Sequence, residues 1–298
     1  MAVILLADDS PTHTALMRSL LEEASHVVHC VGDGLQLMQA LDETVPDLVV
    51  TDLRMPEMNG MQVVQEIAAR YSTIPTVVVT SPGSENLAVD ALALGAANFV
   101  PKNSLRVLLD HVVCQTLQLS QADRLFDQFS GKLLHPEFSM TLNNHLSSIR
   151  PAVTYFIQSL AAAKCMDRTQ RIRVATAVVS ALFNAICFGN LEVSEEEAVI
   201  TRILSGEESG HQELRELANQ ATYRDRHVSL KVSIGEHDTR VLVSHNGPGR
   251  SMRTIPAPGT PESFELEQCR GLMLITSVMD DVKFQSDYSE VVMIKQHA

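Results

Sequence analysis

The sequence predicts two domains of different fold class: an α/β domain with a doubly wound parallel sheet, then a mixed α+β domain. The chain has 298 residues, about twice the length of a typical domain. Up to about residue 119, short β-branched runs alternate with amphipathic stretches, which indicates parallel strands with helices on both faces. Beyond residue 137 the expected strands are grouped late in the sequence, which is typical of antiparallel pairing.

Five short apolar runs are predicted to form the parallel sheet of the first domain. Each is followed by a segment with helical periodicity. The expected strands are Val3–Ala7, Val27–Cys30, Leu48–Thr51, Thr76–Thr80 and Asn98–Val100. The polar segment 120–136 is interpreted as a linker, so the first domain is placed at 1–119 and the second at 137–298. In such sheets, reactive groups gather at the carboxyl ends of the strands.

The second domain is predicted to contain helices between an early strand and a late group of strands. Two segments rich in glycine and proline, 247–249 and 256–261, cannot continue a helix or a central strand and are expected to be loops. The expected elements are a strand at Phe138–Leu142, helices at Ile149–Lys164 and Thr169–Phe188, a polar helical stretch at Ser194–Gln220, strands at His227–Ile234 and Thr239–Ser244, a helix at Leu272–Met279 and a closing strand at Val291–Lys295.

The composition disfavours several classes of protein. A net charge of -13 argues against binding to nucleic acid, whose phosphates bind basic faces. The five cysteines contain no C-x-x-C pair, which argues against a disulfide framework or a zinc site. No apolar run is expected to reach the roughly 20 residues of a membrane helix, and no basic leader precedes the first strand. A cytoplasmic protein without a membrane partner is therefore expected.

Acidic side chains are predicted to meet at one edge of the first sheet. Asp8 and Asp9 follow the first strand, and Asp52 ends the third. Three neighbouring carboxylates repel one another unless a hard cation such as Mg²⁺ neutralises them. Lys102, after the fifth strand, can reach this edge as a positive charge for a phosphoryl oxygen. Thr80, at the end of the fourth strand, supplies a hydroxyl beside it.

With these residues, the first domain resembles the response-regulator receiver family. The resemblance rests on the acidic pair 8–9, the segment 52–60 (DLRMPEMNG), Thr80, the pair 95–96 and the segment 99–102 (FVPK). It implies that Asp52 accepts a phosphoryl group from a histidine kinase or a phosphotransfer protein. It also implies that Mg²⁺ is held by Asp9, Asp52 and the backbone carbonyl of Arg54, with Asp8 supporting the ion indirectly.

The resemblance also assigns the groups around the phosphoacceptor. Phosphoryl transfer depends mostly on positioning and charge neutralisation, so Mg²⁺ and Lys102 need no further catalytic group. Thr80 and Phe99 match the family's switch pair, in which the hydroxyl turns toward the acyl phosphate and the aromatic ring swings inward.

The second domain carries a weaker pattern. Asn184 lies on an apolar helix and is followed by His245-Asn246-Gly247-Pro248-Gly249 and later by Cys269-Arg270-Gly271. In this order and spacing, residues 137–298 resemble the GHKL (Bergerat-type) ATPase fold, and within it the anti-sigma-factor serine kinases. The resemblance implies that Asn184 binds Mg²⁺ with the nucleotide phosphates and that the Gly247 to Gly249 loop approaches the adenine. It also implies that Arg270 and Gly271 open a helix whose N-terminus faces the phosphates.

Three positions depart from that pattern. Ser180 stands where the family has a glutamate that acts as general base, and serine cannot replace it at neutral pH. His245 stands where the family has the aspartate that accepts a hydrogen bond from the adenine amino group. A neutral imidazole can accept one bond but loses the charge. Cys269 replaces the small residue usual in the phosphate loop.

These departures leave three interpretations of the second domain: an active serine kinase, a nucleotide binder without turnover, or a degenerate kinase fold kept as a protein-binding surface. The leading hypothesis is a two-component regulator in which phosphorylation of Asp52 changes the binding of a sigma factor or a STAS-type anti-anti-sigma factor. The alternative is a phosphorylation-gated serine/threonine protein kinase that uses ATP. A third hypothesis is a receiver that stores phosphate, joined to a domain that only forms a homodimer.

Overall fold

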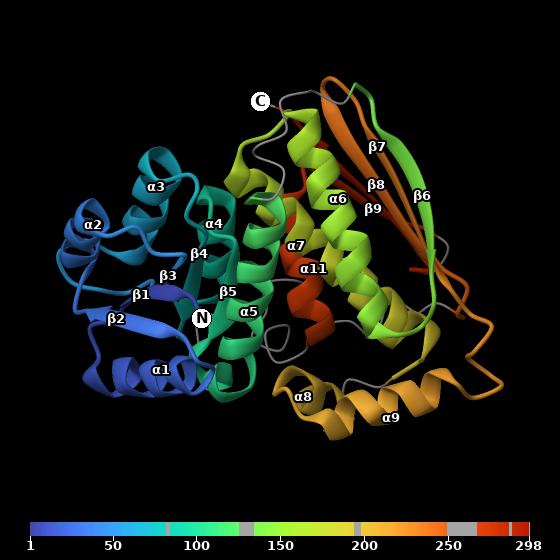
Figure 1. Cartoon of the computed structure of the whole chain (residues 1–298), viewed down its shortest axis with the longest axis horizontal. Coiled ribbons are helices and arrows are strands. Elements are labelled where there is room, and N and C mark those ends of the chain that lie inside the picture. Colours follow the sequence, from blue (N-terminus) through green and yellow to red (C-terminus); the bar gives the residue numbers. More distant parts are fainter. Residues whose placement is uncertain (82–83, 125–133, 194–197, 249–266, 286–287, 298) are drawn as a thin grey trace. The chain divides into compact units, whose positions relative to one another are not determined.

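The structure, a computed structural model of the chain, describes residues 1–81, 84–124, 134–193, 198–248, 267–285 and 288–297. The chain divides into two compact units, each considered by itself (Figure 1). The first unit comprises Met1–Ser120 with Arg168–Arg173, and the second comprises Gln121–Asp167 and Val174–Ala298. The helix α5 (Leu105–Arg124) continues past residue 119 into the segment expected as a linker, and β6 begins at Glu137. Residues 125–133 of that segment lie outside the described part, so the domain limits stay a prediction.

The first unit is a parallel five-stranded sheet in the order β2-β1-β3-β4-β5, as the alternating pattern predicts. Helices α2, α3 and α4 cover one face, and α1 and α5 cover the other (Figure 1). The strands are β1 (Val3–Ala7), β2 (Val27–Val31), β3 (Leu48–Asp52), β4 (Thr76–Thr80) and β5 (Asn98–Pro101). The helices are α1 (Pro11–Glu23), α2 (Gly34–Glu43), α3 (Gly60–Arg70), α4 (Glu85–Leu94), a 3₁₀ turn at Lys102–Ser104, and α5.

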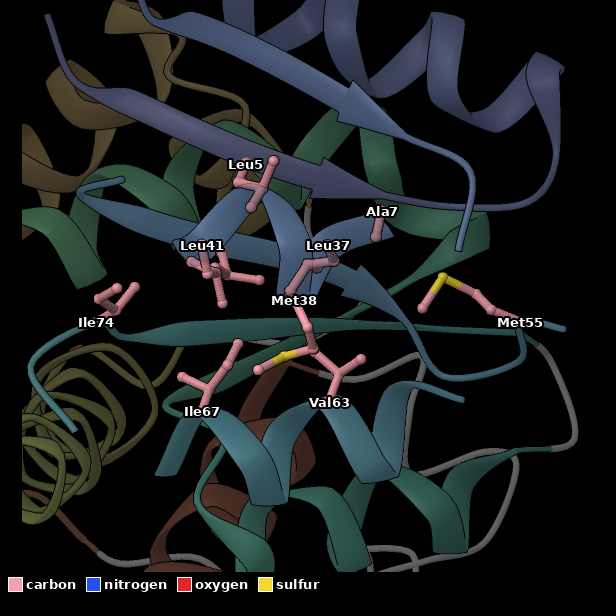
Figure 2. Packing of buried hydrophobic residues seen from close by; sticks show 10 residues of the cluster. Leu5, Ala7, Leu37, Met38, Leu41, Met55, Val63, Ile67 and Ile74 are labelled. Atoms are coloured by element: carbon pink, nitrogen blue, oxygen red, sulfur yellow. The ribbon is translucent and has the colours of Figure 1, made fainter. Parts of the chain in front are cut away.

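Burial on both faces explains the apolar strands of this sheet. All five residues of β3 and of β4 are buried, as expected for central parallel strands. Alternate residues point to opposite faces, and Leu5 and Ala7 of β1 pack against the helices α2 and α3 (Figure 2). The other members of this core cluster are Leu37, Met38, Leu41, Val49, Met55, Val63, Ile67 and Ile74. This packing fixes the strand ends that carry the acidic side chains.

The second unit is α+β, with an antiparallel sheet in the order β6-β7-β8-β10-β9. Helices α6, α7 and α11 cover one face of this sheet (Figure 1). The strands are β6 (Glu137–Leu142), β7 (Val228–Ile234), β8 (Asp238–His245), β9 (Asp281–Gln285) and β10 (Glu290–Gln296). The helices are a 3₁₀ turn at Leu146–Ser148, α6 (Ile149–Ala163), α7 (Arg168–Asn184), a π-helical turn at Ala185–Asn190, α8 (Ala198–Leu204), α9 (Glu208–Ala218) and α11 (Glu267–Val278).

Three elements of the second unit differ from the sequence prediction. The strand β9 was not predicted, because Asp281–Gln285 is short and half polar. The polar stretch 194–220 contains two helices separated at Gly206, whose φ of 79° cannot continue a helix. The helix α11 begins at Glu267, five residues before the predicted start. Residues 256–261, predicted as a loop, lie outside the described part.

The expectation that no stretch is long and apolar enough to cross a membrane is wrong. Arg168–Asn190, which is α7 with its π-helical turn, has 23 residues and meets that requirement by length and composition. However, 72% of its apolar window is buried within the fold. A core helix of a folded domain can be equally long and apolar, so burial within the fold accounts for the length and composition of this stretch.

Candidate functional site

Three carboxylates meet at the carboxyl edge of the parallel sheet, as the sequence predicts. Asp8 and Asp9 follow β1, Asp52 ends β3, and one oxygen of each lies within 4.8 Å of the others. Asp8 and Asp52 are each only 3% exposed, whereas Asp9 is exposed. The backbone amide of Ser10 donates to Asp8 Oδ1 at 2.8 Å and thereby orients that carboxylate. Asp8 is therefore fixed within the fold, while Asp9 faces outward at the same edge.

Lys102 reaches this cluster from the 3₁₀ turn that follows β5. Its ammonium nitrogen lies 2.9 Å from Asp8 Oδ2 and donates a hydrogen bond of 2.8 Å to Asp52 Oδ2. Burial alone would lower the pKa of Lys102, but its bonds to Asp52 and Asp8 raise it above its usual value. The lysine therefore stays charged and holds the two buried carboxylates together.

The charges around Asp52 are only partly balanced. Burial raises its pKa, and the nearby Asp8 adds to this, while Lys102 and the backbone amide of Arg54 act in the opposite direction. Asp52 Oδ1 is buried and accepts no hydrogen bond from the part of the chain that the structure describes. An unpaired buried carboxylate oxygen is costly unless a further partner binds it. Oxygen donors of this kind fit a hard divalent cation.

The loop between β3 and α3 is shaped to pass close to Asp52. A Cβ at Gly60 would lie 2.1 Å from the Asp52 carbonyl oxygen and 2.7 Å from Leu53 Cα, so only glycine fits there. Asn59 caps α3: its side chain accepts from Gln62 N at 3.0 Å, and its amide donates to Gln62 Oε1 at 3.0 Å. The Arg54 amide contacts Asp52, but the ligand role of the Arg54 carbonyl stays a prediction.

Thr80 lies on β4, the neighbour of β3, and Phe99 lies on β5, the edge strand beyond it. Thr80 is the last residue of β4, pairs in register with Pro101 of β5, and is 2% exposed. The Phe99 ring is fully buried, and its role in a switch stays a prediction. His13 is an additional site residue that the sequence did not reveal. Its Nδ1 lies 3.1 Å from the Lys102 ammonium and 3.9 Å from Asp8 Oδ1. His13 lies on α1, four residues after Asp9, and this spacing forms no recognisable sequence motif.

The second unit brings several of its predicted nucleotide positions together. Asn184 and His245 line one pocket of about 50 Å³, together with Ala181, Ala185, Phe188, Gly189, Val243, Leu272, Ile275, Phe284, Tyr288 and Val291. Gly271 lies against the same helix, since a Cβ there would be 3.2 Å from Asn184 Nδ2 and 3.4 Å from Ser180 Cβ. Asn184, Ser180 and Gly271 are thus neighbours at the contact of α7 with α11. Gly249 lies outside the described residues.

His245 forms part of the pocket wall as a neutral imidazole. Its ring packs on Gly189, where a Cβ would lie 2.5 Å from His245 Nε2. That nitrogen lies 3.2 Å from the Tyr288 carbonyl, which can only accept, so Nε2 carries the proton. Burial lowers the pKa of His245 below its usual value, with Arg226 adding to this and the bond to Tyr288 acting against it. The negative charge of the family's aspartate is therefore absent here.

The other departures limit what this site can do chemically. The Ser180 hydroxyl donates to the Thr176 carbonyl at 3.1 Å, a bond within its own helix. The sequence predicted that Arg270 opens a helix, and this is wrong, because α11 already begins at Glu267. Arg270 is 4% exposed and therefore belongs to the interior of the unit. The predicted helix N-terminus facing phosphates is thus displaced by one turn from Arg270 and Gly271.

A polar network around Asn190 was not foreseen. Asn190 is fully buried; its side chain donates to Asn144 Oδ1 at 2.7 Å and accepts from Gly247 N at 2.9 Å. Asn144 Nδ2 in turn donates to the Tyr223 carbonyl at 2.7 Å. A Cβ at Gly247 would lie 2.0 Å from the Gly189 carbonyl oxygen. The loop at Gly247 is therefore fixed against the π-helical turn. A polar residue after an apolar helix was the only sequence signal for this role.

The two units define a response regulator with a kinase-like ATPase domain. The model of the response regulator receiver domain matches residues 4–113. The model of the histidine kinase-like ATPase domain matches residues 142–295, more than half of the chain. The chain belongs to the histidine kinase-like ATPase family and carries an N-terminal receiver domain. A receiver domain implies a histidine kinase or phosphotransfer protein as partner.

Curated relatives resemble the chain over a limited length. The luminescence regulatory protein LuxO of Vibrio campbellii is 30% identical over 123 residues, which cover 40% of this chain and 27% of LuxO. The transcriptional regulatory protein ZraR of Escherichia coli is 32% identical over 117 residues, which cover 38% and 26%. The chain therefore spans about a quarter of the length of the curated relatives it matches.

The chain is also similar to solved structures of receiver domains. The signal receiver domain of a LuxO repressor protein from Vibrio parahaemolyticus is 23% identical, with a TM-score of 0.38, and the match covers 42% of this chain and 95% of that chain. A response regulator receiver domain protein from Clostridium thermocellum is 27% identical, with a TM-score of 0.33, covering 34% and 82%.

Proposed function

We propose that the protein is a two-component response regulator that is phosphorylated on Asp52 and thereby controls the binding of a signalling partner by its ATPase-like domain. The observation that carries this proposal is the buried Asp52 carboxylate, which lies beside Asp8, Asp9 and Lys102. One of its oxygens has no hydrogen-bond partner among the residues that the structure describes. We also propose a cytoplasmic location, which the buried position of the apolar α7 stretch supports.

The geometry suggests how Asp52 takes part in the transfer. Its Oδ1 can attack the phosphorus atom without first breaking the hydrogen bond that Lys102 makes to Oδ2. The new phosphorus–oxygen bond forms as the phosphorus–nitrogen bond of the phosphohistidine donor breaks, and the donor imidazole leaves. Lys102 neutralises a phosphoryl oxygen, and the Thr80 hydroxyl lies at the same edge. When bound by Asp9, Asp52 and the Arg54 carbonyl, Mg²⁺ would offset the charge of the incoming phosphoryl group.

Labelling with radioactive acetyl phosphate and Mg²⁺ tests the phosphoacceptor. We expect Asp52→Ala to abolish incorporation and Asp42→Ala to leave it unchanged. Asp42 is a suitable control because it is an exposed acid on α2, paired with Arg70. Persistent labelling of Asp52→Ala would show that the acceptor is another residue.

Partner binding without efficient turnover is the function we propose for the second unit. The support is the pair of departures, since Ser180 bonds within its own helix and His245 is neutral. The proposed partners are a sigma factor or a STAS-type anti-anti-sigma factor. A pull-down from purified components tests this, comparing the unphosphorylated chain, the phosphorylated chain and Asp52→Ala. We expect partner retention to depend on phosphorylation in the wild type only. Equal retention in all three samples contradicts the proposal.

A phosphorylation-gated serine/threonine kinase is the second candidate, and Asn184 in the pocket with Gly271 against it favours that candidate. Calorimetric titration of the full chain with Mg-ATP distinguishes the two. Absence of binding at millimolar ATP excludes catalysis. If ATP binds, transfer of labelled phosphate to a STAS protein supports the kinase. Binding without transfer supports a nucleotide-dependent interaction domain. If the second domain only dimerises, no partner is captured and sedimentation shows a dimer.

A further inference from the structure

His26, Asp110 and Cys114 form a second cluster of ligand-type side chains in the first unit. One nitrogen, one oxygen and one sulfur atom from these residues lie within 4.8 Å of one another. His26 precedes β2 and therefore lies at the amino edge of the sheet, whereas Asp8 and Asp52 lie at its carboxyl edge. We propose that this cluster binds a zinc-type divalent cation, separately from the acidic edge.

The distances within the cluster are close to those of a tetrahedral zinc site. Cys114 Sγ lies 3.9 Å from His26 Nε2 and 3.3 Å from Asp110 Oδ1. Zinc bonds of about 2.3 Å to sulfur and about 2.0–2.1 Å to nitrogen or oxygen place neighbouring tetrahedral ligands roughly 3.6 Å apart. The two distances lie on either side of this value. Shifts of about 0.3 Å bring each of these two pairs to the tetrahedral spacing, and the ligand atoms of His26 and Asp110 lie within 4.8 Å of each other.

Regular backbone elements hold the three side chains in place. Asp110 and Cys114 are four residues apart on α5, so they lie one turn apart on the same helix face. Ser25 adopts a left-handed conformation, with φ of 66°, after the end of α1. This turn brings the chain back, and the amide of His26 donates to the Leu21 carbonyl at 3.1 Å. The C-x-x-C criterion could not detect this arrangement in the sequence, because the ligands come from distant elements.

The donor types select the class of cation. Nitrogen and sulfur ligands suit zinc, whereas magnesium prefers oxygen alone. His26 Nε2 is the ring nitrogen that faces Cys114. The other nitrogen, Nδ1, is buried and lacks a hydrogen-bond partner in the described residues. Asp110 is exposed, which leaves one side of the cluster accessible to a water molecule as fourth ligand.

Binding changes the protonation of the thiol. Burial, with the Asp110 carboxylate adding to it, raises the pKa of Cys114 to about 12, so without a cation the thiol keeps its proton. Binding forms the metal–sulfur bond, breaks the S–H bond and releases that proton to solvent. Burial lowers the pKa of His26, and the positive N-terminus acts to lower the pKa of both His26 and Cys114. The test therefore needs a chain without an N-terminal tag.

Cobalt(II) titration of the tag-free full-length protein tests the proposal, in excess Mg²⁺ so that the acidic edge is saturated. We expect one equivalent of Co²⁺ to produce thiolate-to-cobalt charge-transfer absorbance, and one equivalent of Zn²⁺ to remove it. Cys114→Ser should lose that absorbance. His26→Gln, which removes a ligand, should weaken the affinity by at least the roughly 10- to 100-fold that loss of an outer-shell partner costs. Circular dichroism and urea unfolding establish that each variant is folded.

Two matched controls complete the experiment. Cys30→Ser removes an exposed cysteine of β2 and should bind Co²⁺ as the wild type does. Asp52→Ala alters the acidic edge and should also leave the absorbance unchanged. Absence of the absorbance in the wild type overturns the proposal, as does equal absorbance in folded Cys114→Ser. In either case the contact of Cys114 with Asp110 is only a hydrogen bond between neighbouring turns of α5.

Discussion

Glycine 60 shows how a single residue type determines whether the acidic edge can form. The α3 backbone comes so close to Asp52 that a Cβ on residue 60 would lie well inside the contact distance of the Asp52 carbonyl oxygen. Asp52, which lies next to Gly60 in space, must keep its carboxylate in place for the acidic edge to form. The identity of residue 60 therefore matters both for stability and for the site.

Replacing Gly60 with alanine should therefore destabilise the receiver and disturb the site. We expect Gly60→Ala to lower the free energy of unfolding by roughly 1–3 kcal/mol, the usual range for overpacking, and to slow labelling by acetyl phosphate. Urea unfolding and labelling rates measure the two effects. Gly32→Ala is the control, because its Cβ would meet its nearest neighbour, a flexible glutamine side chain, at 3.8 Å. Equal stability of the two variants would contradict the close approach.

The neutral state of His245 predicts a pH dependence. Its pKa is lower in the folded chain than the value near 6.5 of an exposed histidine, because burial disfavours the charged ring. Below about pH 6.5 the unfolded chain therefore takes up a proton that the folded chain does not, and stability falls. This contribution is fully present above that pH. It is lost as the pH decreases toward the folded-state pKa.

Urea unfolding at pH 7.5 and 5.5 measures this effect. We expect the loss of stability between these pH values to be smaller in His245→Gln than in the wild type. His237→Gln, an exposed histidine between β7 and β8, serves as control and should resemble the wild type. If His245→Gln and the wild type lose equal stability, the ring is not held neutral by burial.

At the scale of elements, two helices of the receiver begin with similar caps but differ in their distance from the site. Asn59 caps α3 next to the phosphoacceptor loop, and Asp33 caps α2 by accepting from Gln36 N at 2.8 Å. Replacing an N-cap residue with alanine costs about 1 kcal/mol. The two caps therefore separate the contribution to stability from the contribution to the site.

We expect Asn59→Ala and Asp33→Ala to lower the free energy of unfolding by similar amounts, about 1 kcal/mol each. Only Asn59→Ala should also slow phosphorylation of Asp52, because its cap fixes the loop that contacts the Asp52 backbone. Parallel urea unfolding and labelling measurements check this. Slower labelling in Asp33→Ala would mean that labelling reports general stability.

The sequence predicted the receiver elements closely and the second unit less well, for a physical reason. The predicted strand Leu48–Thr51 is only one residue shorter than β3. The agreement is close because fully buried parallel strands are continuous apolar runs bounded by polar residues. The π-helical turn Ala185–Asn190 was predicted as part of a helix that ended at Phe188, since apolar spacing cannot reveal one extra residue in a turn.

The candidate sites follow the same rule. Asp8, Asp52 and Lys102 could be predicted to meet because strand ends converge at one edge of a parallel sheet. By contrast, the contacts of His13 and Asn190 depend on the packing of elements distant in sequence, and periodicity carries no record of them.

At the scale of the whole molecule, a substitution of Lys102 can separate phosphorylation of Asp52 from the change in partner binding that we propose to follow it. Lys102 contacts both buried carboxylates, so we expect it to respond if Asp52 gains a phosphoryl group. A coupling of about 1–3 kcal/mol, roughly 5- to 150-fold in affinity, is enough to control partner binding.

We expect Lys102→Ala to accept label from acetyl phosphate but to show a smaller change in partner affinity on phosphorylation than the wild type. Titration calorimetry or surface plasmon resonance with the purified partner measures this change. Arg18→Ala, which removes an exposed arginine of α1 paired with Glu22, should behave as the wild type. A full phosphorylation response in Lys102→Ala would show that the signal leaves the site by another route.

The position of α5 has a mechanical consequence. The helix begins at Leu105, immediately after the turn that carries Lys102, and continues without interruption for 20 residues to Arg124. At 1.5 Å per residue it is a rod of about 30 Å, so a tilt of about 5° near Lys102 would displace its far end by roughly 2.6 Å. A rod of this length would amplify a small displacement at Lys102, and its far end is where the chain leaves the receiver.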